Sequence, residues 1–180
     1  VLDRQSARLK KLIEDLLEAS KASTGNVEMH MEACDAAVMI SQVVGEYQDK
    51  LQAQDIEIVV NEAKNPANIM ADGRHLWRVF DNIMSNICKY TQDHTRVYVN
   101  VEDAGDQVRM IFKNISKYPL NISSDELMER FVRGDASRNT EGHGLGLSIA
   151  SSLTALMDGQ LTIDIDGDLF KITVAMKKQA

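Results

Sequence analysis

The sequence predicts an α+β fold: a two-layer sandwich in which helices cover one face of one mixed sheet, with an amphipathic helix in front of it. Three observations predict this fold. Several segments place apolar residues at the i, i+3, i+4, i+7 spacing of a helix face. Others alternate apolar and polar residues and are joined by turns rich in Asp and Gly. With 180 residues, of which 44% are apolar, the chain can bury one sizeable core.

An amphipathic helix opens the chain, with Lys, Glu and Asp on the side opposite its apolar stripe. The polar run 20–26 interrupts the pattern, and Gly25 is a stop signal. We expect the stripe to have no partner within the chain, although a helix packed on its own domain is the alternative. The stripe consists of Leu2, Leu9, Leu12, Ile13, Leu16 and Leu17.

The elements that follow alternate between helix and strand. A second helix is expected over residues 35–54, with Val38, Val43, Val44, Tyr47 and Leu51 on its apolar side. The further expected elements are strands at 56–60 and 67–71, a helix around 76–90, a hairpin of 96–102 and 107–113, a short helix at 125–131, a polar segment at 132–142, a helix at 145–157, and a hairpin of 160–165 and 169–175.

The helix at 76–90 carries polar residues beside its apolar face. At about 100° per residue, Asn82, Asn86 and Lys89 fall in one narrow stripe next to the buried side. Two amides and an ammonium aligned there can receive a metal ion and phosphate oxygens. The apolar face itself consists of Leu76, Val79, Phe80, Ile83, Met84 and Ile87.

The glycine segment, residues 142–147, supplies what that stripe lacks. Its glycines let backbone N–H groups approach an anion, and it runs into a helix whose N-terminus favours negative charge. Its residues are Gly142, His143, Gly144, Leu145, Gly146 and Leu147. A dinucleotide-binding turn is a poor explanation of these glycines, because no buried strand leads directly into them.

Charge and cysteine usage narrow the function classes. A net charge of −7 argues against a nucleic-acid partner, whereas ATP remains compatible because a few placed cations and Mg²⁺ decide its binding locally. Cys34 and Cys88 lack CxxC spacing, which predicts reduced thiols in the cytoplasm. Without a run of about 18 apolar residues or a signal peptide, the chain is expected to be soluble.

Three segments together resemble the ATP-binding catalytic domain of sensor histidine kinases, in the GHKL group of ATPases. Residues 82–91 are similar to the asparagine box, 127–135 to the phenylalanine box and 141–149 to the second glycine box. The resemblance spans nearly the whole chain and implies the GHKL fold, with ATP and Mg²⁺ as cofactors. Residues 1–24 would be the second helix of a dimerisation and phosphoacceptor hairpin, and 25–180 the catalytic domain.

The resemblance also implies roles for single residues. Asn86 would be the Mg²⁺ ligand, Lys89 would neutralise a phosphate, and Tyr90 could stack on the adenine. Asn82 stands where ATP-hydrolysing relatives have a Glu that deprotonates water, so the site favours phosphoryl transfer. Arg130, Arg133 and Arg138 flank a polar segment that could close as a lid and bring them to the γ-phosphate, while His143 either contacts a phosphate or faces solvent.

The chain departs from the family at the first glycine box, where D-x-G-x-G is usual. Asn114, Ser116 and Tyr118 occupy the three signature positions. Asn114 could accept a hydrogen bond from the adenine amino group through its carbonyl oxygen, but more weakly than a carboxylate would. This departure motivates one alternative, a pseudokinase that binds a partner protein without using ATP.

The phosphoacceptor histidine is expected outside the chain. No His stands in the pattern H-[ED]-x-x-x-P, so the acceptor would lie upstream in a parent protein. The chain would be a cytoplasmic fragment of a membrane-anchored bacterial sensor. The parent protein would be a homodimer, and a response regulator would be its partner. A serine kinase of the anti-sigma-factor type is the second alternative. The leading helix and the sequence pattern N-x-x-K-Y argue against it.

Overall fold

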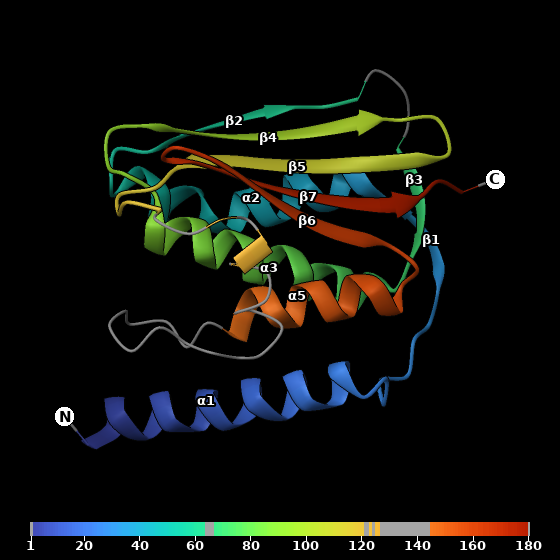
Figure 1. Cartoon of the computed structure of the whole chain (residues 1–180), viewed down its shortest axis with the longest axis horizontal. Coiled ribbons are helices and arrows are strands. Elements are labelled where there is room, and N and C mark those ends of the chain that lie inside the picture. The colour runs from blue at the N-terminus through green and yellow to red at the C-terminus, as the bar shows by residue number, and fades with distance from the viewer. Residues whose placement is uncertain (1, 64–66, 121–122, 124, 127–144, 180) are drawn as a thin grey trace.

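A five-stranded mixed sheet forms the centre of the computed structural model, which describes residues 2–63, 67–120, 123, 125–126 and 145–179. Its strands run in the order β2-β4-β5-β7-β6 (Figure 1). β2 pairs with β4 in parallel, and the other neighbours pair antiparallel. The strands are β2 (Glu57–Asn61), β4 (Arg96–Asp103), β5 (Gln107–Ile115), β6 (Gln160–Asp166) and β7 (Leu169–Lys177).

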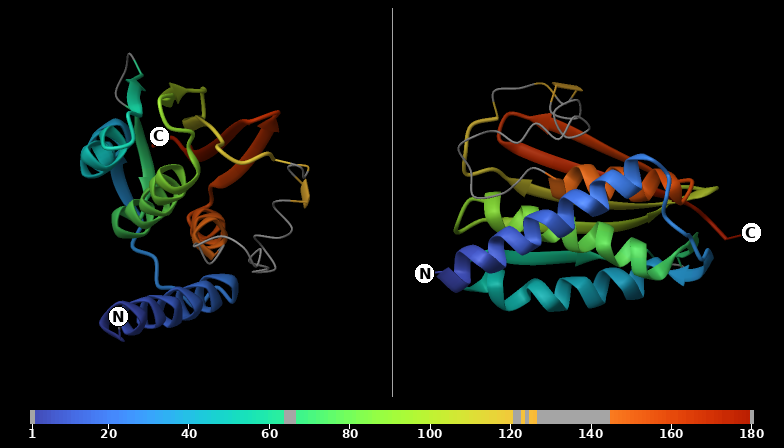
Figure 2. Two further views of the ribbon diagram at one scale, coloured as in Figure 1. Left: turned by 90° about the vertical axis from the view of Figure 1, so that its left-hand side faces the viewer. Right: turned by 90° about the horizontal axis from the view of Figure 1, so that it is seen from below.

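Helices α2 (Ala36–Gln52), α3 (Gly73–Tyr90) and α5 (Leu145–Leu156) cover one face of this sheet (Figure 2). Alternate residues of the strands point into the helical layer, as Val97, Val99 and Val101 of β4 do. Phe80 of α3 meets Phe112 of β5 with ring centroids 5.9 Å apart. The core therefore lies between the sheet and the three helices.

A second, two-stranded sheet flanks the start of α3. β1 (Glu32–Asp35) pairs antiparallel with β3 (Asn68–Ala71). An aspartate at the end of β1 and another directly after β3 cap the following helices: Asp35 accepts hydrogen bonds from the first turn of α2, and Asp72 accepts one from His75 N of α3. These caps explain why both helices begin where they do.

Helix α1 (Leu2–Ser23) lies outside the helical layer and packs on α5, on the side away from the sheet (Figures 1 and 2). Ala22 is buried in this contact, and Leu12, Asp15 and Glu18 are half-buried. Its apolar stripe faces outward, since the large side chains at Leu9, Ile13, Leu16 and Leu17 are 51–60% exposed. Within the described residues, no helix is both long and apolar enough to span a bilayer.

The α+β fold with a mixed sheet and a leading helix is confirmed, and several details differ from expectation. β1 was not predicted, because four residues lack a periodicity of their own. Val38 is 51% exposed rather than on the apolar side of α2, since the cap at Asp35 phases the helix to bury Ala36 and Ile40. β5 continues beyond residue 113 to Ile115, where it still pairs with β7. The polar side of α1 contacts the domain, as the alternative for this helix allowed.

Candidate nucleotide site

The polar stripe of α3 lies at the border of the core, as its spacing predicts. Asn82 is buried, Asn86 is half-buried and Lys89 is exposed. The side chains therefore emerge progressively from the core over two turns of the helix. Asn82 Nδ2 is buried and has no hydrogen-bond partner among the described residues.

α3 and the start of α5 meet at Asn82 and Gly146. A β-carbon at Gly146 would lie 3.5 Å from Asn82 Oδ1 and 3.8 Å from Asn82 Cβ. The asparagine stripe and the end of the glycine segment, which lie far apart in the sequence, are therefore so close that a single added β-carbon would bring them into van der Waals contact. The first turn of α5 accordingly begins beside the amides of α3, and the positive end of its dipole lies there.

Asn114 lies on the neighbouring strand β5, on the face that the helices cover. It is 4% exposed and follows Met110 and Phe112 in the alternation of buried residues. The C-terminal end of α3 approaches this part of β5 through a bridge between Thr91 and Ser116. Gln92 N donates to Ile115 O at 2.8 Å, and Lys117 N donates to Tyr90 O at 2.9 Å.

The other predicted residues divide into two groups. Tyr90 and Leu145 are half-buried, and Leu147 is buried in the core, so only the backbone of Leu147 is available to a ligand. Arg130, Arg133, Arg138, Gly142, His143 and Gly144 lie outside the described residues, as does most of the short helix expected at 125–131.

The described residues could supply only a few ligands to a metal ion, which suits an ion that is coordinated mainly by the phosphates of a nucleotide. Within the described part of the chain, no group of three or more His, Cys, Asp or Glu is arranged to hold a metal ion. Mg²⁺ accepts one or two protein oxygens and completes its shell with phosphates and water. The half-buried amide of Asn86 fits that arrangement.

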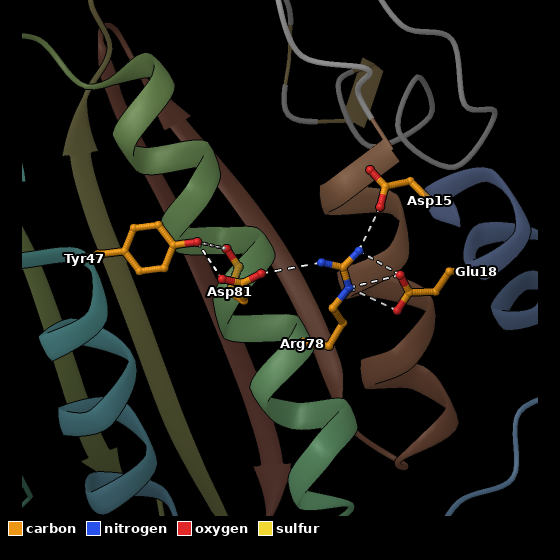
Figure 3. A network of polar contacts seen from close by, with 5 residues as sticks. All are labelled: Asp15, Glu18, Tyr47, Arg78 and Asp81. Carbon is orange, nitrogen blue, oxygen red and sulfur yellow. Dashed lines mark hydrogen bonds and ion pairs between the residues drawn. The ribbon is translucent and has the colours of Figure 1, made fainter. Parts of the chain in front are cut away.

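Arg78 of α3 ties α1 to the helical layer (Figure 3). Its guanidinium lies 2.9 Å from Asp15 Oδ1 and 2.8 Å from Glu18 Oε2 on α1, and 3.5 Å from Asp81 Oδ2. Asp81 Oδ1 in turn accepts a hydrogen bond of 2.5 Å from the hydroxyl of Tyr47 on α2. The network therefore joins α1, α3 and α2, and it lies one turn before Asn82.

This network changes the acid strength of its members. Burial alone would lower the pKa of Arg78, but the hydrogen bonds and charge of Glu18 and Asp15 raise it. Burial, and then the hydrogen bond to Asp81, raise the pKa of Tyr47 above its ordinary value. Arg78 therefore stays charged and Tyr47 neutral at physiological pH.

Two features near the candidate site were not predicted from the sequence. Arg78 carries no motif, and only its spacing from Asp81 within one helix hinted at an ion pair. Thr91, the last residue of the asparagine box, is completely buried although it is polar. No periodicity predicts that burial, because Thr91 follows the helix and is placed by its bridge to β5.

Comparison with known proteins places these features in a family. Residues 71–179, more than half of the chain, match the family described as histidine kinase-, DNA gyrase B-, and HSP90-like ATPase. The chain is 28% identical over 173 residues to the probable sensor protein PcoS of Escherichia coli. The aligned region covers 94% of this chain and 36% of PcoS. It therefore spans about a third of that relative.

Solved structures show the same fold. The Acinetobacter baumannii histidine kinase AdeS superposes with a TM-score of 0.80 at 17% identity, over 99% of this chain and 83% of that one. The histidine kinase ThkA, in a complex with the response regulator protein TrrA, gives a TM-score of 0.77 at 20% identity, over 98% and 49%. The chain thus belongs to the histidine kinase-, DNA gyrase B-, and HSP90-like ATPase family.

Proposed function

We propose that this domain binds Mg²⁺-ATP where α3 meets the start of α5, and transfers the γ-phosphoryl group to a histidine of a dimerisation hairpin. The close approach of Asn82 and Gly146 carries the proposal. It puts a wall of amides and an ammonium next to a helix N-terminus, so groups for a metal and for phosphates converge on one place.

Each described residue has a distinct task in this site. Asn86 offers its amide oxygen to Mg²⁺, which would bridge the phosphates and neutralise their charge. Lys89, exposed one turn further on, reaches a phosphate as a point charge. The base would bind near Tyr90, at the C-terminal end of α3, and Asn114 on β5. Among the residues outside the described part, Arg130, Arg133, Arg138 and His143 would approach the phosphates together with Gly142 and Gly144.

Asn82 favours phosphoryl transfer over hydrolysis. Its amide cannot accept a proton from water, and its side chain is only 8% exposed. A buried amide can hold a position and donate a hydrogen bond, and positioning with charge stabilisation supplies most of the catalysis of phosphoryl transfer. The nucleophile then has to be brought by another element.

That element, on this proposal, is the hairpin whose second helix is residues 1–24, ahead of the catalytic domain at 25–180. The exposed apolar stripe of α1 supports pairing with a second copy into a four-helix bundle. The complex of ThkA with TrrA supports a response regulator as the later phosphate acceptor. We place the domain in the cytoplasm, connected to a membrane only through other segments of a parent protein.

The proposal is tested by phosphotransfer to a separately supplied hairpin that carries the parent's histidine. With Mg²⁺-ATP, the wild-type chain should produce acid-labile phosphate on the hairpin and none on itself. Asn86→Ala should lower both the transfer rate and the Mg²⁺ dependence of ATP binding measured by calorimetry. Asn100→Ala is the matched control, because its amide pairs with Asn61 on the open face of the sheet.

A pseudokinase is the second candidate, motivated by the first glycine box. Ser116 and Tyr118 replace glycines, and the Ser116 hydroxyl is bonded to the backbone of Tyr118 rather than left open. Wild-type chain that binds neither ATP nor GTP in the presence of Mg²⁺ would favour this candidate. Binding that persists unchanged in Asn86→Ala would remove Asn86 from the metal site.

A further inference from the structure

Thr91 is a buried hydroxyl without a hydrogen-bond partner among the described residues. It is 0% exposed, and its Oγ1 is one of three buried side-chain N or O atoms without a partner in that part of the chain. Leaving a buried polar group unbonded costs free energy, because the group gives up its hydrogen bonds to water. Such a group in a folded domain therefore calls for a physical explanation.

The bridge to β5 decides which side chains can reach this hydroxyl. Thr91 pairs antiparallel with Ser116, so both side chains point to the same face. Asn114, two residues before Ser116, points to that face as well, and all three residues are buried. The Ser116 hydroxyl already donates to Tyr118 O at 2.8 Å and accepts from Tyr118 N at 3.3 Å. Asn114 contributes the other polar side chain of β5 on this face.

The separation suits a hydrogen bond between the two. Diagonal neighbours on one face of an antiparallel pair have β-carbons about 7 Å apart or slightly less. A hydroxyl and an amide that extend toward each other close this gap to hydrogen-bonding distance. Because no part of Thr91 reaches the surface, a partner for its hydroxyl has to come from within the fold rather than from a ligand.

The chemistry of an amide makes such a partner necessary. A carboxylate offers acceptor oxygens at both ends, whereas an amide has one acceptor end and one donor end. Only the carbonyl end suits the 6-amino group of adenine, and the NH₂ end suits the 6-oxo group of guanine. An asparagine at this position therefore selects adenine over guanine only if another group holds its NH₂ group toward the protein interior, away from the base.

We propose that Thr91 is a positioning residue for base recognition: its hydroxyl accepts a hydrogen bond from Asn114 Nδ2 and so turns Asn114 Oδ1 toward the adenine amino group. The inference rests on the proposed ATP site and adds how that site selects its base. The unpartnered hydroxyl and the register that places it beside Asn114 carry it.

The test compares affinities for Mg²⁺-ATP and Mg²⁺-GTP by calorimetry of the whole chain. Thr91→Val keeps the shape and removes the hydroxyl, and should lower the ratio of ATP to GTP affinity about tenfold. Thr91→Ser restores the hydroxyl and should restore most of the ratio. Thermal unfolding checks that each variant folds, and Thr91→Ala replaces Thr91→Val if the latter does not.

The decisive comparison repeats Thr91→Val in an Asn114→Asp background. A carboxylate needs no orientation, so there the substitution should leave the ATP to GTP ratio unchanged. Equal losses for both nucleotides in both backgrounds would mean a purely structural role for Thr91 and overturn the inference. An unchanged ratio in the Asn114 background would overturn it too. Failure of the wild-type chain to bind ATP would overturn the proposed function, and this inference with it.

Discussion

Removing the charge of Asp72 should make the stability of the domain depend less on pH. Asp72 Oδ1 accepts from His75 N at 3.1 Å, Oδ2 accepts from His30 N at 2.9 Å, and Oδ2 lies 3.0 Å from His75 Nδ1. Asp72 thus caps α3 and holds the segment that connects α1 to β1. Asp72→Asn keeps one acceptor oxygen for the cap at His75 N, and replaces the charged oxygen that accepts from His30 N with an NH₂ group, much as protonation of the carboxyl would.

The magnitude follows from the pKa of this carboxyl. Burial alone would raise the pKa of Asp72, but the backbone hydrogen bonds from His30 and His75 and the contact with the His75 ring outweigh it. Together they lower the pKa from 3.8 to about 2. A pKa difference of that size between the unfolded and folded chain corresponds to roughly 2 kcal/mol.

The direction of the pH effect follows from which state binds the proton first. Above about pH 4 the carboxyl of Asp72 is ionised in both states, and its full contribution is present. As the pH falls below that range the unfolded chain takes up the proton first, and the contribution is lost until the pH reaches about 2. The difference between wild type and Asp72→Asn should therefore be roughly 2 kcal/mol at pH 7 and shrink toward zero near pH 2.

Urea unfolding followed by circular dichroism from pH 7 to pH 2.5 measures this difference. Asp93→Asn, at an exposed turn, is the matched control and should leave the wild-type profile nearly unchanged. Asp72→Ala should cost about 1 kcal/mol more than Asp72→Asn at pH 7, because the cap is lost as well. Parallel pH profiles for wild type and Asp72→Asn would refute the reasoning.

Two further predictions concern packing and association. Gly159→Ala should destabilise the domain by about 1–3 kcal/mol, since the new β-carbon would clash with Met176 Sδ and lie 2.8 Å from the backbone oxygen of Ala175. Gly45→Ala, in the exposed interior of α2 with nothing within 4 Å, should instead stabilise the domain by about 0.5–1 kcal/mol. Urea midpoints that moved in the same direction for both variants would contradict this contrast. Leu9→Glu combined with Leu16→Glu should convert a longer protein that carries the complete hairpin from dimer to monomer in analytical ultracentrifugation, and an unchanged mass would show that this stripe is not the dimer contact.

Periodicity predicted most of the fold because most elements bury one face. The spacing of apolar residues in α3, and the alternation of apolar and polar residues in β4, β5, β6 and β7, result directly from that burial. β1 and the last residues of β5 are different, because pairing partners far away in the sequence place them. Val38 shows a third limit, since an apolar residue beside a helix face can still point outward.

The site was predictable in its parts and less so in its arrangement. The spacing of Asn82, Asn86 and Lys89 predicted that they share a stripe beside the buried face, and the resemblance predicted that α3 and the glycine segment would meet. The close approach of Asn82 and Gly146 specifies where they meet. Sequence could not predict that Thr91 pairs with Ser116, two residues from Asn114, since a single bridge between separate elements makes that pair.

The two sides of α1 show why the apolar pattern alone does not predict which side of an amphipathic helix contacts its own domain. The apolar side of a helix ordinarily faces its own domain, yet here Leu9, Ile13 and Leu16 face outward. The domain instead holds α1 through a small buried residue, Ala22, and through the charges that meet Arg78. Because the attachment uses the polar side, the apolar stripe stays open while the helix is docked. One helix can therefore contact the catalytic layer and a second chain at the same time, which a helix docked by its apolar side could not do.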